Sequence, residues 1–445
     1  MARSSRRVVI SGIGPIASPG LGIDAMWTAL CEGRSGVGLC STFDASGFEC
    51  PFVSQVAPDR FDVKSVVPKS YRKATKVMAR DIELAVGGAF EAVRTAELVT
   101  KAHEPANGKV TIAADRMGCQ IGAGLIAAEE NELTAALVTS RNASGAFDIT
   151  AWGSIGMQNL TPLWMLKYLP NMLACHVTIC HDCQGPSNTI TCGEASALLS
   201  IGESMRVIVR GHADACLSGG AESKVNLMAI LRQQYAGRLA KATLQDDPAT
   251  LVRPFAKNAI GCVAGDGGGI LVVEAADSVA ARGGKALAEL AGFGASQSFC
   301  PDTVGAEMAP EGDGISDAMQ AALDDAGVKA ESVDAVIPFG CGVPSFDHAE
   351  ASGIRRVFGN RAATLPLVTI STITGSCGAG FGAVAAAVGV QCLRTGMLPA
   401  RVNGDASLGI DAAPIAARKA DLKTILVCTP SLGGQNAAIV LRRVA

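Results

Sequence analysis

The sequence predicts an α/β protein in which mixed β-sheets pack against helices. Apolar segments typical of strands alternate with helical segments at 82–93, 196–209, 314–326 and 379–393, which is the order expected of βαβ units. Hydrophobic residues make up 49% of the 445 residues, aromatic residues make up only 4%, and glycine occurs 51 times. This composition suits closely packed layers of small side chains, and the length allows one large core or two to three domain-sized units.

The first elements in chain order are strands. Residues 7–14 are expected to form a strand and its turn, and residues 118–124 a second strand that runs into a glycine turn. Near the end, residues 378–393 form the longest apolar tract, rich in glycine and alanine. Because a membrane helix needs ~20 apolar residues, this shorter tract predicts a buried helix and no membrane association.

Charge and cysteine content exclude other classes of protein. The net charge is −3, so nothing indicates binding to a nucleic-acid backbone. The basic start at residues 3–7 is followed by an apolar run too short for a signal peptide, and an opening strand is the better interpretation. Fifteen cysteines without a secretory leader then indicate a reduced, cytoplasmic setting and no disulfide framework.

The most informative segment runs from Gly185 to Gly202 and begins Gly-Pro-Ser-Asn-Thr-Ile-Thr-Cys-Gly-Glu-Ala-Ser. It resembles the active-site segment of the β-ketoacyl synthases, in which a reactive Cys follows the Ser of Gly-Pro-Ser by seven residues. Both flanks match without a gap, and Glu194 stands at the Cys position. A thiolate carries an acyl group through a covalent intermediate, which a carboxylate does not do in ordinary thioester exchange.

The other catalytic positions of that family are also replaced. The family's first His falls on Phe339, ahead of a matching Pro and Asp-x-x-Glu. The Lys and second His of its Lys-Ser-x-x-Gly-His segment fall on Ser371 and Ser376. The histidines normally stabilise the enolate formed on decarboxylation, a task that Phe does not perform and Ser performs weakly. The resemblance therefore implies that no catalytic residue and no cofactor is present.

The resemblance extends over nearly the whole chain and implies the thiolase fold. In that fold two related halves, here 1–254 and 255–445, stack as α-β-α-β-α layers, with the former active site where the halves meet. Residues 171–178 match a helix and strand of the family. Segments 41–76 and 234–252 look like insertions that cap the pocket.

A chain that has this fold but lacks the catalytic residues resembles the chain-length factor of type II polyketide synthases and related polyene systems. The usual replacement for Cys there is Gln, so Glu194 is a departure. The resemblance implies a heterodimer with a catalytic ketosynthase and a chain tunnel at the dimer interface. It also implies that an acyl carrier protein binds and delivers the chain. The residues matching tunnel positions are Leu125, Trp164, Tyr168 and Leu432.

Two other classes of function stay open. The chain is alternatively a diverged acyltransferase or decarboxylase that uses Glu194 or Cys192, or an acyl-binding scaffold that forms a homodimer. Cys192 is expected in the strand before the helix, away from the dipole that lowers a thiol pKa. Glu194 at a helix N-terminus is expected to close the site or to bind a polar group. Alternatively, it only fills an inactive pocket and forms a hydrogen bond to Ser376.

A cluster of Cys and His side chains between residues 175 and 192 raises the question of zinc. Structural zinc sites use Cys and His at short spacings, but they normally need a second pair at a matching spacing. No second Cys-x-x-Cys follows downstream. Because cysteine is among the most buried residue types, core packing is the preferred interpretation, and no metal site is predicted.

Overall fold

The computed structural model describes residues 6–103, 108–299, 308–431 and 433–444. Within these ranges twelve strands form one sheet whose main path is β10-β13-β14-β9-β1-β8-β7-β5-β6. The strands of this path are β1 (Val8–Ala17), β5 (Met117–Ala123), β6 (Ser187–Ile190), β7 (Ala215–Ser223), β8 (Ala264–Ala275), β9 (Ala288–Gln297), β10 (Ala335–Ile337), β13 (Thr424–Pro430) and β14 (Gln435–Arg442).

Short strands lie beside this path. They are β2 (Gly20–Leu21), β3 (Gly38–Leu39) and β4 (Phe52–Ser54), while β11 (Met397–Leu398) and β12 (Arg418–Lys419) make a separate pair. The helices are α1 (Ile23–Glu32), α2 (Arg80–Thr95), α3 (Glu130–Thr139), α4 (Ile149–Ser154), α5 (Met172–His181), α6 (Ser196–Val209), α7 (Leu227–Tyr235), α8 (Ala276–Ala281), α9 (Asp313–Ala326), α10 (Pro344–Phe358), α11 (Ser371–Thr374) and α12 (Phe381–Thr395).

The sheet consists of two similar halves that meet at one short pairing. In the first half β5 and β7 are parallel and β8 returns antiparallel to β7; in the second half β10 and β13 are parallel and β14 returns antiparallel to β13. The halves join where Val9 and Ile10 of β1 pair with Glu289 and Ala288 of β9. Strand β8 follows the predicted boundary at residue 254 in sequence, yet it lies in the first half between β1 and β7.

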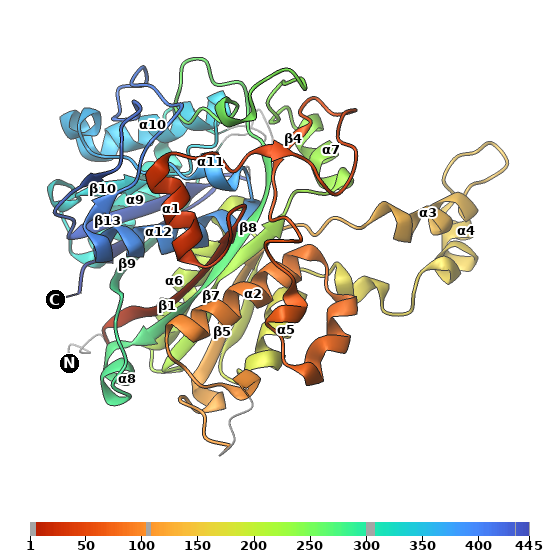
Figure 1. The fold of residues 1–445 in the computed structure, drawn as a ribbon, viewed down its shortest axis with the longest axis horizontal. Helices are drawn as coiled ribbons and strands as arrows, with labels where there is room; N and C mark the ends of the chain where they lie inside the picture. The colour runs from red at the N-terminus through yellow and green to blue at the C-terminus, as the bar shows by residue number, and fades with distance from the viewer. Residues whose placement is uncertain (1–5, 104–107, 300–307, 432, 445) are drawn as a thin grey trace.

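The helices complete the five layers that the sequence predicts. Helix α2 covers the outer face of the first half against β1, β8 and β7, and α9 covers β9 and β14 on the outer face of the second half. Helices α6 and α12 form the middle layer: α6 packs on β5 and β7, and α12 on β8 and β13. The α-β-α-β-α architecture is therefore confirmed (Figure 1).

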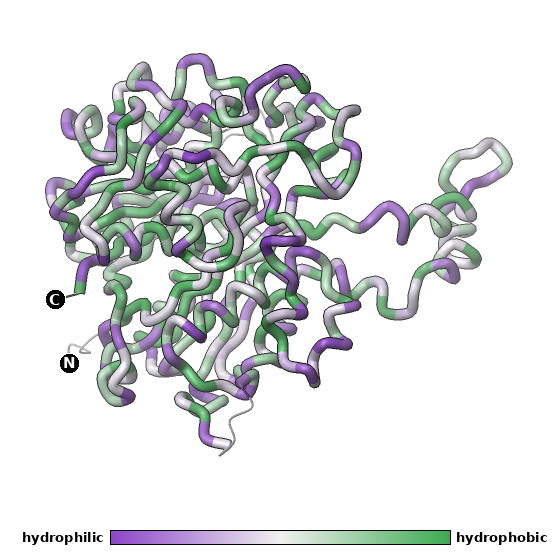
Figure 2. Tube along the Cα trace, in the orientation of Figure 1, coloured by the Kyte–Doolittle hydropathy of each residue, from purple (hydrophilic) through white to green (hydrophobic). Residues whose placement is uncertain are grey.

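The middle layer depends on small side chains. All residues of α12 from Phe381 to Leu393 are buried, and hydrophobic residues concentrate along the central strands and helices (Figure 2). At Gly382 a Cβ atom would lie 2.8 Å from Cγ of Leu198 in α6, so glycine lets the two helices approach closely. No helix in the described part of the chain is long and apolar enough to span a bilayer.

Most predicted helices are present, with one correction. The helix expected at 196–209 is α6, and those expected at 82–93, 314–326 and 379–393 are α2, α9 and α12 with ends shifted by one to two residues. The strand expected in the second part of 171–178 is wrong, because the segment continues as helix α5. The buried side chains of α5 recur at the three- and four-residue spacing of a helix face, and this packing outweighs the strand preference of Val177 and Thr178.

Residues 125–170 form an arm that leaves the body of the molecule and carries α3 and α4 (Figure 1). Within the arm, α3 and α4 pack on each other and on the 3-10 turn Gly156–Asn159. Ten of the nineteen large hydrophobic side chains that the described residues expose lie in this arm. They are Leu125, Leu137, Val138, Phe147, Ile149, Ile155, Met157, Leu163, Met165 and Leu166.

Candidate functional site

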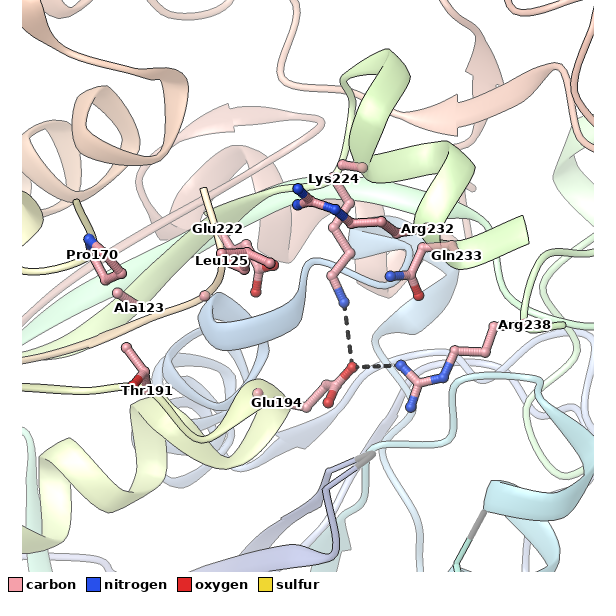
Figure 3. A pocket seen from close by; sticks show the side chains of 13 residues that line it. Ala123, Leu125, Pro170, Thr191, Glu194, Glu222, Lys224, Arg232, Gln233 and Arg238 are labelled. Atoms are coloured by element: carbon pink, nitrogen blue, oxygen red, sulfur yellow. Dashed lines mark hydrogen bonds and ion pairs between the residues drawn. The ribbon is translucent and has the colours of Figure 1, made fainter. Parts of the chain in front are cut away.

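A pocket of about 480 Å³ opens at the carboxyl ends of the parallel strands β5 and β7. Crevices at this edge of a parallel sheet are the usual binding sites of α/β proteins. The lining comes from the ends of the two strands, Pro170 ahead of α5, the turn before α6, helix α7 and the loop after it. The residues are Ala123, Gly124, Leu125, Pro170, Thr191, Gly193, Glu194, Glu222, Lys224, Ala229, Arg232, Gln233 and Arg238 (Figure 3).

Glu194 lies on the floor of this pocket in the 3-10 turn Gly193–Ala195 that leads into α6. Its side chain is 3% exposed. Its Oε1 atom accepts hydrogen bonds from Nζ of Lys224 at 3.3 Å and from Nη1 of Arg238 at 3.1 Å (Figure 3). The position expected to hold a nucleophile therefore holds the anion of a buried ion-pair cluster.

Both cations of the cluster are themselves buried. Burial alone would lower the pKa of Lys224, but the carboxylates of Glu194 and Glu222 outweigh it and raise that pKa, so the ammonium stays charged. Arg238 is 6% exposed, and its guanidinium lies 4.7 Å from the ring centre of Phe346, where a cation is attracted to the aromatic face.

Glu222 is the second carboxyl group of the pocket. Burial raises its pKa, while the charge of Lys224 and a hydrogen bond from the backbone N–H of Ala379 oppose the shift. That bond measures 2.7 Å and ties the end of β7 to the turn before α12. Glu222 therefore links the pocket to the second half of the molecule.

The other three replaced positions lie outside the pocket lining. Phe339 is buried, and its ring packs edge-on against Phe381 with centroids 4.7 Å apart. Oγ of Ser371 donates a 2.6 Å hydrogen bond to the carbonyl of Gly340. Ser376 is buried, and its backbone N–H donates to the carbonyl of Val263. The partners of Glu194 include Lys224 and Arg238.

Two buried carboxyl groups still hold the loop that carries Phe339. Glu350 accepts hydrogen bonds from the backbone N–H groups of Phe339 and Gly340, both at 2.8 Å. Asp347 accepts from the N–H of Gly342 and, at 2.7 Å, from that of Phe255. Burial raises the pKa of Glu350 to about 8 and that of Asp347 to about 7, although these N–H donors favour the ionised form. The support of the loop is thus intact without an imidazole on it.

Cys192 is not placed as the sequence suggests. Strand β6 ends at Ile190, so Cys192 lies beyond the strand, immediately before the turn at Gly193, and its backbone N–H donates to Oγ of Ser196. Burial raises the pKa of its thiol. Little thiolate forms at neutral pH, so the Cys192 side chain is not activated as a nucleophile.

Of the four predicted tunnel residues, Leu125 lines the pocket and is 66% exposed. Trp164 and Tyr168 lie at the base of the arm, where their rings pack with centroids 5.2 Å apart. The Tyr168 hydroxyl donates to Glu132 at 2.7 Å. Leu432 lies outside the described residues. Leu125 and Glu194 thus line the same pocket, whereas Trp164 and Tyr168 are not among its lining residues.

The Cys and His side chains near α5 are occupied by packing and local hydrogen bonds. Nδ1 of His176 lies 2.8 Å from the hydroxyl of Tyr71, and Nδ1 of His181 lies 2.9 Å from that of Thr100. Burial lowers the pKa of His181 to about 3, so this ring is neutral. Across the described residues, no group of three or more His, Cys, Asp or Glu side chains is arranged to hold a metal ion.

Sequence reasoning missed Lys224, Arg232 and Arg238. The segments 41–76 and 234–252 do pack together, through side chains such as Phe52, Val53 and Leu251, but only the second one reaches the pocket, with Arg238. A signal was present, because a carboxylate at a buried position requires a compensating cation. Lys224, two residues after Glu222 at the end of an apolar strand, was the natural candidate.

Fold and site together define a condensing-enzyme architecture in which the position that the sequence motif assigns to a nucleophile carries an ion pair. Comparison with family models agrees: the β-ketoacyl synthase N-terminal domain matches residues 5–278, and the C-terminal domain matches residues 287–405. The chain therefore belongs to the β-ketoacyl synthase family.

Curated relatives resemble the chain over its whole length. It is 29% identical to 3-oxoacyl-[acyl-carrier-protein] synthase 2 of Vibrio cholerae serotype O1, covering 99% of this chain and 100% of the relative. It is 28% identical to the enzyme of the same name from Staphylococcus aureus strain COL, covering 99% of each chain. These relatives support membership of the family across both halves.

Solved structures share the fold. The ishigamide ketosynthase/chain length factor is 27% identical, with a TM-score of 0.80 over 99% of this chain and 100% of that one. A β-ketoacyl synthase from Burkholderia phymatum STM815 is 24% identical, with a TM-score of 0.81 over 99% and 100% of the two chains. The second likeness shows only a shared fold, which is the thiolase fold.

Replacing Glu194 with Ala should destabilise the protein by about 3–5 kcal/mol, because two buried cations lose the carboxylate they share. The free energy of unfolding from urea denaturation measures the effect. Asp421→Ala is the matched control, since Asp421 pairs with Lys423 and Arg443 in an exposed position and its loss should cost less than about 1 kcal/mol. Equally small losses in both variants would show that the Glu194 cluster is not a structural element.

Glu350 should make stability depend on pH. Its pKa of about 8 in the folded state exceeds the value of about 4.3 in an unfolded chain, so its stabilising contribution is complete below about pH 4 and is lost as pH rises through 8. Glu350→Gln cannot titrate. The stability advantage of the wild type over this variant should therefore shrink between pH 5 and pH 8, by at most about 1.4 kcal/mol per pH unit.

Denaturation of both proteins at pH 5, 6.5 and 8 tests this dependence. The stability advantage of the wild type over Asp347→Asn should also shrink as pH rises. This loss should be complete nearer pH 7, because the pKa of Asp347 is about 7. A wild-type advantage that stays constant or grows with pH would refute the assignment.

Proposed function

We propose that this chain is a non-catalytic subunit of a heterodimeric ketosynthase that elongates chains bound to an acyl carrier protein in a type II polyketide or related pathway. In this role a catalytically intact homologue performs the condensation, and this chain shapes the end of the chain tunnel. The observation that carries the proposal is the ion-pair cluster of Glu194, Lys224 and Arg238 at the nucleophile position.

The chemistry of the site supports a non-catalytic role. A carboxylate held by two cations is a poor nucleophile towards a thioester, and the nearest thiol, Cys192, has a raised pKa. Phe339 packs against Phe381, where it offers no donor to a developing enolate. The relatives named 3-oxoacyl-[acyl-carrier-protein] synthase 2 support the substrate class, and the ishigamide ketosynthase/chain length factor supports the pairing of two subunits.

Two surfaces support an obligate dimer. Strand β6 ends the main path of the sheet, and its Ser187 and Asn188 side chains are exposed, so one of its edges is open to a further strand. The arm of residues 125–170 exposes ten large hydrophobic side chains, more than a soluble monomer usually shows in one region. A homologous ketosynthase subunit would cover both.

A basic surface supports the proposed binding of an acyl carrier protein. Between residues 64 and 76 the chain exposes five cationic side chains and no acidic one, although the whole protein has a net charge of −3. They are Lys64, Lys69, Arg72, Lys73 and Lys76. A carrier protein presents its substrate on an arm that contains an anionic phosphodiester, which such a surface would attract.

The two alternative functions predict different behaviour in solution. An acyltransferase or decarboxylase that uses Glu194 or Cys192 would act as an isolated chain. An acyl-binding scaffold would form a stable homodimer and ignore any ketosynthase. The cytoplasm is the compartment we propose for each of these, given the many free thiols of the described residues.

The isolated chain should transfer no acyl group and decarboxylate no malonyl group above background. Glu194→Cys alone should not restore condensation, because Phe339 and Ser376 leave the enolate without charge stabilisation. Intact mass after incubation with acyl and malonyl carrier protein is the measurement. An acyl adduct on Cys192, or steady release of carbon dioxide, would falsify the non-catalytic assignment.

The chain should assemble with an intact ketosynthase into a heterodimer whose interface exceeds ~2,000 Å², as expected for permanent partners. Co-expression followed by native mass measurement should give a one-to-one complex. A stable monomer at micromolar concentration, measured by light scattering, would exclude an obligate dimer, and a homodimer that persists beside the ketosynthase would favour the scaffold.

Replacing Trp164 and Tyr168 with Ala should lengthen the products of the complex or broaden their distribution. Large side chains at a tunnel end limit length, since a packed wall accommodates extra methylenes only at a cost of ~1–3 kcal/mol. Tyr168→Phe is the control, because it keeps the ring and removes only the hydrogen bond to Glu132. Unchanged product lengths in the folded double Ala variant would mean that these rings only pack the base of the arm.

A further inference from the structure

The pocket around Glu194 carries more positive than negative charge. Three cations line it, Lys224, Arg232 and Arg238, against the two carboxyl groups of Glu194 and Glu222. Three positive charges less two negative charges leave a net charge of +1 when both carboxyl groups are ionised. Such a lining favours an anion over a neutral ligand.

Hydrogen-bond donors also exceed acceptors in this pocket. An ammonium offers three N–H groups and a guanidinium five, yet Lys224 and Arg238 converge on one oxygen of Glu194. Their distances of 3.3 and 3.1 Å exceed the 2.7–2.9 Å typical of charged hydrogen bonds. Among the described residues, Nε and Nη2 of Arg238 have no hydrogen-bond partner. Both of these atoms are buried, so the capacity for a further acceptor lies with Lys224, whose ammonium makes one such bond with its three N–H groups among the described residues.

The rest of the lining is apolar and open on one side. Ala123, Leu125, Pro170 and Ala229 face the same cavity as the cations, and Leu125 is largely exposed. Arg232 comes from α7, and in Figure 3 it lies on the same side of Glu194 as Lys224. The volume of about 480 Å³ falls in the range of small-molecule sites.

We propose that this pocket binds a small organic monoanion, a carboxylate on a short hydrocarbon chain. The carboxylate lies between Lys224 and Arg232, and the chain lies along Leu125 and Pro170. A net charge of +1 matches one negative charge, and Glu194 and Glu222 repel a dianion such as phosphate. The binding involves no covalent step and no partner subunit, so it goes beyond the proposed function and stands or falls separately from it.

Titration of the purified chain with hexanoate, followed by calorimetry, tests the site. Hexanamide has the same shape without the charge, and it should bind at least about tenfold more weakly, since a charge-assisted hydrogen bond contributes more than a neutral one. Inorganic phosphate should also bind more weakly than hexanoate. Equal binding of hexanoate and hexanamide, or no hexanoate binding at millimolar concentration, would overturn the proposal.

Three variants locate the binding. Arg232→Met removes an exposed cation, should leave the fold intact, and should weaken hexanoate binding about three- to fivefold. Glu194→Gln removes the competing carboxylate and should strengthen hexanoate binding. Lys423→Met, a cation at the exposed ion pair with Asp421, is the control and should change nothing. Equal affinities in Arg232→Met and Lys423→Met, or weaker binding in Glu194→Gln, would place hexanoate elsewhere.

Discussion

The close packing of α6 against α12 is the constraint on which the site depends. Gly382 lets the two buried helices approach, and the turns that begin them, Gly193–Ala195 and Gly378–Gly380, come into contact. Whatever side chain stands at residue 194 is therefore held at the centre of the molecule, below the ends of β5 and β7. A position fixed in this way does not tolerate an unpaired charge.

The surrounding chain compensates for that charge from two directions. Lys224 follows directly on strand β7, and Arg238 comes from the loop after α7, which packs with the segment around Phe52. The site thus draws on elements that lie far apart in sequence, and the polar cluster sits among apolar layers. Meanwhile Glu350 continues to hold the Phe339 loop through backbone hydrogen bonds alone. The backbone support of this loop therefore does not depend on the side chain at residue 339.

The sequence was sufficient for the layers and for the central helices, because their periodicity and small residues are local signals, as in α6 and α12. It was also sufficient to locate Glu194, which the motif places by spacing. It did not reveal Arg238, because a residue in a loop is brought to a site by tertiary packing that no local pattern records. The strand expected after Ala174 failed for a similar reason: burial of one helix face overrode the preference of its β-branched residues.

The ion-pair cluster also bears on how this lineage can change. A Cys at residue 194 would leave Lys224 and Arg238 buried together without their carboxylate. A substitution at residue 194 alone therefore costs stability, which accompanying changes of Lys224 and Arg238 would offset. Under mutation the three side chains therefore behave as one unit and not as three independent positions.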